Sequence, residues 1–543
     1  MATHEVFNQA IKGFGYNPAD YPVIEESLRR EGAHDRFAEV REAGALGGSE
    51  YALELGDLAE AHPPVLKTHD RYGFRIDEVT YDPAYHQLMT QATALGLHGT
   101  PWADPKPNPH LTRAAKSLVW GQVDAGHGCP ISMTYAVVPA LRANPELAAM
   151  CEAKLAAPTY DPKLAPIADK FSLTAGMSMT EKQGGSDVRA NTTRALAQSD
   201  GTYLITGHKW FTSAPMSDFF LTLANTDAGV TCFFVPRILP DGTRNNFFLQ
   251  RLKDKLGNHS NASSEVEYDN TVAWRVGDEG RGVRTIIEMV NMTRLDCTLG
   301  TANLMRIGVQ QATEHASQRK AFGAALIDQP AMRNVLADLA VEAESATTVA
   351  LWLAALTDRT DDPETAALRR ISLSVSKYYV CKRGPVHAGE ALECFGGNGY
   401  VEESRMPRLY REAPLLSVWE GSGNVAALDT LRAMAKQPET LGVFFAEVEK
   451  AAGTDARLDG AIARLKDQFN DLETAQYRAR AVVGSMAKVL QGSLLVRHGH
   501  SAVADAFCAS RLGDNWGDVF GTLPTGLDVG TIIDRALPKT SAV

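Results

Sequence analysis

The stretch GTYLITGHKWFTS, residues 201–213, decides the fold class because it is strand-like sequence set between long helical regions. Three further runs share its content of β-branched and aromatic residues: FFLTLAN (219–225), VTCFFVPRI (230–238) and SSEVEYDNTVAW (263–274). The dipeptides Asp200–Gly201 and Asp241–Gly242 supply turn chemistry between such runs. The sequence therefore predicts an antiparallel β-domain, which we place at residues 176–282.

Helical periodicity dominates both flanks of this β-domain. Before it, LTRAAKSLVWGQVDAG (111–126) has apolar residues at helical spacing, and proline-rich breaks separate such pieces. After it, three long runs predict the helices of a bundle, the last with a bend at Pro385: 283–322, 331–358 and 365–395. Residues 440–543 add further helical sequence.

The predicted fold class is therefore α+β, mostly α, in four segments. These are an N-terminal helical domain (1–175), the β-domain (176–282), a helical bundle (283–439) and an additional C-terminal helical domain (440–543). A chain of 543 residues is long for one hydrophobic core, which agrees with several domains.

Charge, cysteine content and the absence of long apolar runs limit the kinds of protein that this sequence can encode. The net charge of -11 argues against a surface built throughout for nucleic acid, although a local basic patch is compatible with it. The seven cysteines are odd in number and form no CxxC pair, which favours a reducing, cytoplasmic location over a disulfide framework or a zinc ribbon. No signal peptide and no membrane span is expected, because no run of 18 apolar residues occurs.

Two motifs border the first strands. In MTEKQGGSD (179–187), glycines allow close approach of a ligand, and hydroxyls can donate hydrogen bonds to it. In GHKWFTSAP (207–215), Phe211 and Ser213 share one strand face, where a flat aromatic ligand could stack and accept a bond. Taken alone, the first motif is more often a polar loop and the second more often an ordinary half-buried strand.

A third motif, SVWEGSGN (417–424), places the carboxylate of Glu420 between a tryptophan and a glycine-rich turn. Taken alone, such a residue is usually a solvated turn carboxylate. No dinucleotide-binding GxGxxG follows a strand and no P-loop is present, so those two phosphate-binding motifs are excluded.

Five motifs in order resemble those of the acyl-CoA dehydrogenase family of flavoproteins: MTEKQGGSD, GHKWFTS, QRKAFG (318–323), ECFGGNGY (393–400) and VWEGSGN (418–424). The helix–β–helix order is similar too. RLKDKLGNHSNAS (251–263), RLYREAP (408–414) and the long C-terminal extension resemble the AidB-like branch, which is associated with the adaptive response to alkylation damage. The resemblance covers nearly the whole chain.

The resemblance implies an FAD site and a homotetramer, a dimer of dimers in which a neighbouring subunit completes each site. The cofactor-binding positions that carry over are Met179, Thr180, Gly185, Ser186, Phe211, Ser213, Arg319, Phe322, Gly396, Gly397, Trp419, Gly421, Ser422 and Asn424. Arg319 suits a pyrophosphate because a guanidinium pairs well with phosphate oxygens. Ser422 or Asn424 is expected to cap the helix that follows the turn.

The resemblance also implies that Glu420 is the catalytic base. It would remove the α-proton of an acyl thioester while hydride leaves the β-carbon for flavin N5, and burial beside Trp419 would raise its pKa as that task requires. Arg294 resembles an arginine near the substrate entrance, although a helix-face salt bridge explains it equally well. CPISMTYA (129–136) is expected either to line the pocket or to pack in the core.

Three functions remain open at this point. The first is an acyl-CoA dehydrogenase-type enzyme acting on an acyl-CoA. The second is a DNA-binding flavoprotein of the alkylation response, although residues 440–543 hold 11 Lys+Arg against 12 Asp+Glu and are not a basic domain. The third is a flavin oxidase or monooxygenase, which retention of Glu420 disfavours. No metal site is expected, because the histidines of RHGHS (497–501) have no cysteine or carboxylate at ligand spacing.

Overall fold

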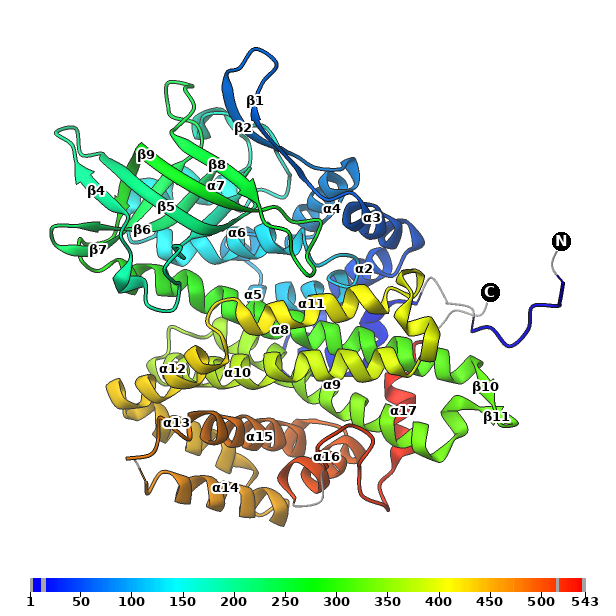
Figure 1. The fold of residues 1–543 in the computed structure, drawn as a ribbon. Coiled ribbons are helices and arrows are strands. Elements are labelled where there is room, and N and C mark those ends of the chain that lie inside the picture. Colours follow the sequence, from blue (N-terminus) through cyan, green and yellow to red (C-terminus); the bar gives the residue numbers. More distant parts are fainter. Residues whose placement is uncertain (1–2, 11–15, 472, 514–516, 540–543) are drawn as a thin grey trace. The chain divides into compact units, whose positions relative to one another are not determined.

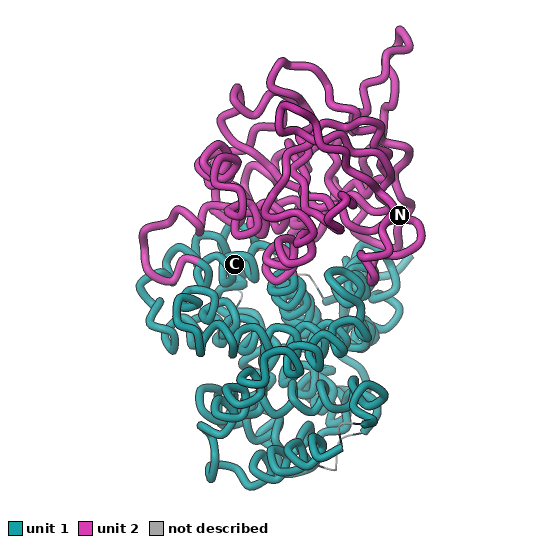
Figure 2. The backbone as a smooth tube through the Cα atoms, turned by 90° about the vertical axis from the view of Figure 1, so that its left-hand side faces the viewer, with its two compact units in different colours: residues 1–50, 110–122, 294–543 teal, residues 51–109, 123–293 magenta. Residues whose placement is uncertain are grey.

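The computed structural model describes residues 3–10, 16–471, 473–513 and 517–539. The chain divides into two compact units, which Figure 2 shows in different colours. Unit 1 contains residues 1–50, 110–122 and 294–543, and unit 2 contains residues 51–109 and 123–293. The predicted four-segment division stays a prediction, and the two units cut across it because the first 175 residues contribute to both. Residues 540–543 of the predicted C-terminal domain lie outside the described residues.

Unit 1 is built from helices (Figure 1). Its N-terminal pieces are α1 (Pro22–Arg30), α2 (Phe37–Gly47) and α5 (Pro109–Trp120). Its long helices are α8 (Gly282–Gln318, beginning in unit 2), α9 (Pro330–Thr357) and α10 (Pro363–Glu393), followed by α11 (Met406–Val418) and α12 (Gly423–Lys436). The extension contains α13 (Glu439–Val448), α14 (Ala456–Gln468), α15 (Ala479–His498), α16 (Ser501–Phe507) and α17 (Val529–Ala536). A short hairpin, β10 (Lys320–Ala321) and β11 (Ala324–Ala325), follows α8.

These helices confirm the predicted bundle. The run at 283–322 forms one helix, α8, which ends at Gln318 and gives way to the β10–β11 hairpin. Helix α10 continues through Pro385 without interruption. The ring of this proline removes one backbone donor, but packing of a long apolar-faced helix outweighs that loss.

Helix α9 lies in the core of unit 1, and the C-terminal extension packs on it. Arg511 pairs with Asp338 at 2.5 Å, and Arg535 pairs with Glu344 at 2.7 Å. These pairs tie the extension to α9 through buried charges. By length and composition, α9 is also the one helix of the described residues that could cross a membrane, and its most apolar window is entirely buried within the fold.

Unit 2 contains the β-domain and four helices. The helices are α3 (Glu50–Ala61), α4 (Pro83–Ala94), α6 (Gly128–Leu141) and α7 (Pro145–Leu155). The seven-stranded sheet contains β3 (Ala175–Ser178), β4 (Arg194–Ala197), β5 (Tyr203–Ser213), β6 (Phe219–Thr226), β7 (Gly229–Pro236), β8 (Phe247–Leu252) and β9 (Ser263–Val276).

The sheet is mainly antiparallel, as predicted, but it closes on itself. Strands pair in the ring β6–β7–β9–β5–β4–β6, and β8 adds to β9. Two pairings are parallel, β3 with β6 and β4 with β6, which corrects the all-antiparallel prediction. The reason is topological: residues 179–193, between β3 and β4, return along the sheet, so β3 and β4 both run in the direction of β6.

A second correction concerns the hairpin β1 (Val65–His69) and β2 (Arg75–Thr80), which falls inside the region predicted as mainly helical. Asp70 makes its turn by accepting hydrogen bonds from the backbone N–H groups of Tyr72 and Phe74, at 2.8 and 2.9 Å. Its first strand alternates only between exposed and half-buried residues. The second strand buries only Asp77 and Val79, one of them polar, which leaves little hydrophobic periodicity for a sequence reading to detect.

The core of unit 2 is aromatic. Phe219 stacks on Phe234 with ring centroids 4.4 Å apart, and Phe220 stacks on Phe247 at 4.9 Å. Helix α6 packs beside β3, where the Thr134 hydroxyl accepts a bond from the backbone N–H of β3 at 3.1 Å. The CPISMTYA motif lies in α6 and is almost entirely buried, so core packing accounts for it. Strand β3 leads directly into the MTEKQGGSD motif.

Candidate functional site

Glu420 lies in a tight turn between helices α11 and α12, within unit 1. The backbone takes the left-handed conformation at two successive residues, Glu420 with φ 59° and Gly421 with φ 104°. A glutamate rarely adopts this conformation, since its Cβ crowds the following carbonyl. Strain of this kind persists only where surrounding contacts enforce it, and it is concentrated at functional sites. We call residues 419–421 the Glu420 turn.

Two buried cations hold the backbone of the Glu420 turn. Arg294 Nε donates to the Glu420 carbonyl oxygen at 3.0 Å. Lys377 Nζ donates to the carbonyl oxygen of Gly421 and, at 3.4 Å, to that of Ser417 at the end of α11. Carbonyls at the end of a helix lack partners within the helix, so these cations satisfy groups that would otherwise be orphaned. Glu420 as a residue is half-buried, and its carboxylate oxygen Oε2 is buried.

A buried carboxylate in turn fixes Arg294. Asp429 of α12 accepts from Arg294 Nη1 at 2.8 Å and pairs with Arg370 of α10 at 3.1 Å. Burial alone would raise the pKa of Asp429, but the charges and hydrogen bonds of both arginines outweigh it and hold that pKa below its usual range. Arg294 therefore contacts the turn and holds its backbone. Of the two interpretations that the sequence left open, the structure shows a salt bridge, formed with Asp429, and the role near the substrate entrance stays a prediction.

The expected helix cap after the turn does not form. Ser422 occupies the N-cap position of α12, but its side chain makes no capping hydrogen bond. Asn424 lies inside the helix, one residue beyond its start, and is exposed. The left-handed turn orients the chain so that Gly423 begins the helix directly. Trp419 is half-buried and ends α11, its N–H donating to the Leu415 carbonyl at 2.9 Å.

A separate group of predicted cofactor residues lies in unit 2, in the loop from Met179 to Ser186 that follows β3. It makes a tight turn in which the Glu181 and Gly184 backbones exchange two hydrogen bonds, at 3.2 and 3.0 Å. This turn brings Thr180 against Gly185, where a Cβ would meet the Thr180 hydroxyl at 2.4 Å. Only glycine therefore fits at position 185 without displacing Thr180. Ser186 is exposed, and Met179 and Thr180 are half-buried.

Strand β5 lies beside this loop. The Trp210 N–H donates to the Thr180 carbonyl at 2.8 Å, so Phe211 is adjacent to the loop. The side chain of Phe211 is 51% exposed although it lies on a central strand. Ser213 is half-buried, and its hydroxyl lies 3.4 Å from that of Ser263 on β9. Unit 2 thus holds a half-exposed aromatic ring, with Lys253 Nζ 4.9 Å from its centroid, and several hydroxyls.

The remaining predicted cofactor residues lie in unit 1. Phe322 is fully exposed at the tip of the β10–β11 hairpin, with φ 51°. Arg319 precedes this hairpin and donates to the Asn8 carbonyl at 2.5 Å. Gly396 and Gly397 begin a short 3-10 helix and are exposed. One guanidinium nitrogen of Arg319 is thus bonded within the chain, while Phe322 at the hairpin tip is exposed to solvent.

The predicted residues therefore fall into two sets. Unit 2 holds Met179, Thr180, Gly185, Ser186, Phe211 and Ser213. Unit 1 holds Arg294, Arg319, Phe322, Gly396, Gly397, Trp419, Glu420, Gly421, Ser422 and Asn424.

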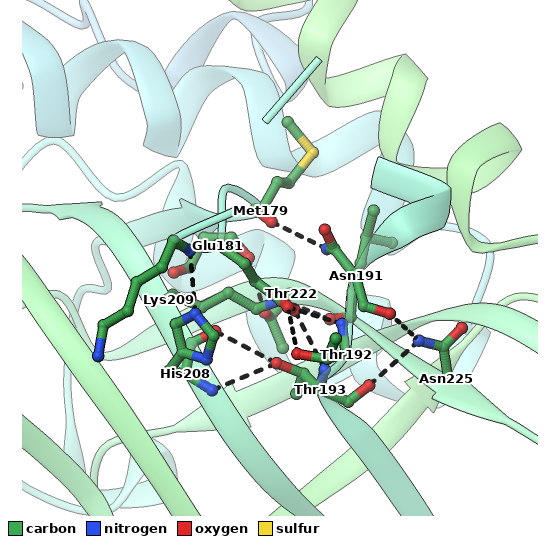
Figure 3. Close-up of polar contacts among 12 residues, drawn as sticks. Met179, Glu181, Asn191, Thr192, Thr193, His208, Lys209, Thr222 and Asn225 are labelled. Atoms are coloured by element: carbon green, nitrogen blue, oxygen red, sulfur yellow. Dashed lines mark hydrogen bonds and ion pairs between the residues drawn. The ribbon is translucent and has the colours of Figure 1, made fainter. Parts of the chain in front are cut away.

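The sequence reading missed the residues that support these motifs. Lys377 and Asp429 hold the Glu420 turn, and Glu181 and Lys209 hold the Met179–Ser186 loop, as Figure 3 shows for the latter pair. A signal was present in SVSKYYVC, where Lys377 is a single charge within an apolar helical run. Among the described residues no cluster could hold a metal ion, and His500 instead caps α16.

Comparisons with known proteins agree with this layout. Residues 8–162 match the AidB N-terminal domain, residues 176–271 the acyl-CoA dehydrogenase middle domain, and residues 280–435 the acyl-CoA dehydrogenase C-terminal domain. The chain is 42% identical to AidB of Escherichia coli (strain K12) over 509 residues, 93% of this chain and 94% of AidB. It is 28% identical to acyl-CoA dehydrogenase family member 11 of Caenorhabditis elegans, over 89% of this chain and 84% of that protein.

Solved structures show the same fold. The crystal structure of Caenorhabditis elegans ACDH-11 in complex with C11-CoA aligns with a TM-score of 0.87 at 26% identity, covering 95% of this chain and 94% of that one. Butyryl-CoA dehydrogenase from Megasphaera elsdenii aligns with a TM-score of 0.58 at 20% identity, covering 74% of this chain and 98% of that one. The second likeness is one of fold alone.

The fold and the site together define a protein of the acyl-CoA dehydrogenase family, to which this chain belongs. The family is flavin-dependent. Within it the chain belongs to the AidB-like branch, since the match to AidB extends over nearly the full length of both proteins.

The described residues fit a flavin. The half-exposed Phe211 ring offers a stacking surface, although Lys253 Nζ lies 4.9 Å from its centroid. The Thr180 and Ser213 hydroxyls, from the adjacent loop and the same strand, can donate hydrogen bonds. The glycine at 185 lets the loop fold tightly against Thr180.

Proposed function

We propose that this protein is an FAD-dependent acyl-CoA dehydrogenase in which Glu420 is the catalytic base. The observation that carries the proposal is the Glu420 turn. Its left-handed backbone is held by Arg294 and Lys377, each of which donates to a carbonyl oxygen of the turn. These contacts keep a strained glutamate backbone in one conformation, and strain of this kind is concentrated at functional sites.

The task we propose for Glu420 is to remove a proton from the carbon α to a thioester carbonyl. The proton moves to a Glu420 carboxylate oxygen as the β-carbon loses a hydride, and the acyl chain becomes an α,β-unsaturated thioester. The flavin, when bound, supplies the acceptor for that hydride. Glu420 Oε2 is buried, and a drier carboxylate is a stronger base.

The substrate we propose is an acyl-CoA. Support comes from the similar ACDH-11 structure, which is a complex with C11-CoA. The length of the acyl chain is left to experiment. The test is anaerobic addition of a panel of acyl-CoAs from short to long chain to the flavin-loaded protein, with the visible absorbance of the flavin as readout. Bleaching by at least one member is expected, and an unbleached flavin with every member would overturn the proposal.

A homotetramer is a second part of the proposal. The support is the fully exposed Phe322 at the hairpin tip, a large aromatic side chain that no other part of the described chain covers. The measurement is the molar mass in solution by light scattering, for the wild type and for Phe322→Ser. We expect about four chains for the wild type and a smaller assembly for the variant.

No observation favours the alternative of a DNA-binding flavoprotein, so we do not propose it. Several basic side chains of the extension are engaged within the chain. Arg457 pairs with Asp455 and Asp505, and Arg464 donates to the Leu512 carbonyl at 2.8 Å. The oxidase or monooxygenase reading has no support beyond the shared fold.

A cytoplasmic location completes the proposal. Its support is that all seven cysteines are free and buried, which suits a reducing compartment. Fractionation of cells that express the protein would test it, and recovery in a membrane or secreted fraction would contradict it.

A further inference from the structure

Glu181 is a buried charge in an otherwise open loop. Its neighbours Lys182, Gln183 and Gly184 are exposed, whereas the Glu181 side chain has no exposed surface. A carboxylate is rarely buried in this way unless it is paired and hydrogen-bonded. Nothing in the proposed chemistry uses this group directly, so its burial needs a separate explanation.

The contacts of Glu181 saturate its two oxygens (Figure 3). Oε1 accepts from Lys209 Nζ at 2.8 Å and from the Thr193 N–H at 3.3 Å. Oε2 accepts from the Thr192 N–H at 2.7 Å, from the Thr192 hydroxyl at 3.1 Å, and from Gln183 Nε2 at 2.8 Å. One carboxylate therefore satisfies two backbone donors and one buried ammonium group.

Lys209 extends these contacts into the sheet. Its side chain also has no exposed surface, and Nζ donates to the Leu223 carbonyl of β6 at 2.8 Å. The loop is tied to β5 a second time, because the Lys182 N–H donates to His208 Nε2 at 2.9 Å. Asn191 adds a third tie by donating to the Met179 carbonyl at 3.0 Å.

We propose that Glu181 and Lys209 are positioning residues for the flavin: their buried ion pair holds the Met179–Ser186 loop at the distance from β5 that cofactor binding requires. The inference depends on the proposed function, since it assumes that this loop and Phe211 contact the cofactor. It adds that the affinity for flavin is set by a pair that does not touch it.

Electrostatics agree with a permanently charged pair. Burial alone would raise the pKa of Glu181, but the Lys209 charge and the hydrogen bonds from Lys209, Thr193 and Thr192 lower it to about 2. Burial lowers the pKa of Lys209 to about 8, against the opposing effect of Glu181. Both groups are therefore charged at neutral pH.

A purely stabilising role is the competing explanation. A buried pair could often be replaced by apolar side chains at little cost in stability, so stability alone gives weak reason for it. An apolar side chain at position 181 would leave the backbone N–H groups of Thr192 and Thr193 without their acceptor. The pair therefore determines where the loop lies, and not only how firmly the sheet is folded.

The chain offers a matched control. Lys170 is a buried lysine of the same unit that pairs with Asp218 at 2.7 Å and donates to the carbonyls of Asp161 and Lys163. None of these partners belongs to the Met179–Ser186 loop. Lys170→Met should thus cost stability as Lys209→Met does, but leave the loop in place.

The experiment compares wild type, Lys209→Met and Lys170→Met by two readouts. The first is the FAD dissociation constant, measured by flavin fluorescence well below each melting temperature. The second is the rate of limited trypsin cleavage after Lys182 in the flavin-free protein. We expect Lys209→Met to weaken FAD binding about tenfold or more and to speed this cleavage, with Lys170→Met within about twofold of wild type in both.

Equal FAD affinity in the two variants would overturn the inference, even if Lys209→Met speeds cleavage. A wild type that binds no flavin would overturn the proposed function as well, so the two failures are distinct. If Lys209→Met yields no folded protein, Glu181→Gln replaces it, because it removes the charge and keeps the shape. Wild-type FAD affinity in Glu181→Gln would then overturn the inference.

Discussion

In both the Glu420 turn and the Met179–Ser186 loop, buried charged side chains bind backbone groups, but the charges are opposite in sign. In the turn, buried Arg294 and Lys377 donate to backbone carbonyls. In the loop, buried Glu181 accepts from backbone N–H groups. The turn follows the end of α11, where carbonyls lack partners, whereas the loop precedes β4, where N–H groups lack them. Each segment is fixed by the charge that its unsatisfied backbone groups require.

The largest effect in this comparison should come from Arg294. Replacing it by Met removes the donor to the Glu420 carbonyl and leaves Asp429 buried with Arg370 alone. We expect Arg294→Met to lower the free energy of unfolding by about 2–4 kcal/mol, measured by urea titration. Arg370→Met is the matched variant, because Asp429 then keeps its shorter bond to Arg294. A larger loss in Arg370→Met would show that the turn does not depend on Arg294.

Backbone strain at the turn should give the next largest effect. Gly421 has φ 104°, and a Cβ there would lie 3.1 Å from Val425 Cγ1. Gly421→Ala should cost about 1–2 kcal/mol in thermal or urea unfolding. Gly442 in α13 has open space around it, so Gly442→Ala should be neutral or stabilising. Equal behaviour of the two variants would contradict the conformation described for the turn.

The next prediction concerns the Glu181 carboxylate of the loop, whose charge should make the free energy of unfolding depend on pH in acid. The folded-state pKa of Glu181 is about 2, below the ordinary value of 4.5, so its contribution to stability is present above pH 4.5. It is lost as the pH falls from 4.5 toward 2. We expect Glu181→Gln to flatten the loss of stability in this window, by on the order of 1 kcal/mol, in urea titrations at several pH values. An unchanged pH dependence would mean that Glu181 is not paired in the folded protein.

The smallest effect should come from Ser422. Its side chain makes no capping bond to α12, so Ser422→Ala should change the free energy of unfolding by less than about 0.5 kcal/mol. Asp362 provides the contrast, since its side chain accepts from the Thr365 N–H at the start of α10, at 2.9 Å. Asp362→Ala should cost about 1 kcal/mol by the same measurement. A similar loss in Ser422→Ala would reveal a cap at the Glu420 turn.

The sequence allowed the helix–β–helix order, the long helices and the placing of each motif to be predicted, because these follow from local periodicity and ordered motifs. It did not reveal the buried residues that hold the motifs in place. Lys377 contacts a residue 44 positions away and Arg294 one 126 positions away, separations at which no local pattern operates. The β1–β2 hairpin was missed because its strands have little buried face, and the parallel pairings were missed because they depend on topology.

The central claim is that Glu420 is the base, and the most direct test is anaerobic reduction of the bound flavin by an acyl-CoA in Glu420→Gln. The variant keeps the shape of the side chain and the backbone contacts of Arg294, so it should retain flavin. Glu439→Gln, at an exposed position, is the control. We predict that Glu420→Gln reduces the flavin at least about a hundredfold more slowly than wild type, while the control is unchanged. Reduction of the flavin in Glu420→Gln at the wild-type rate would contradict the claim.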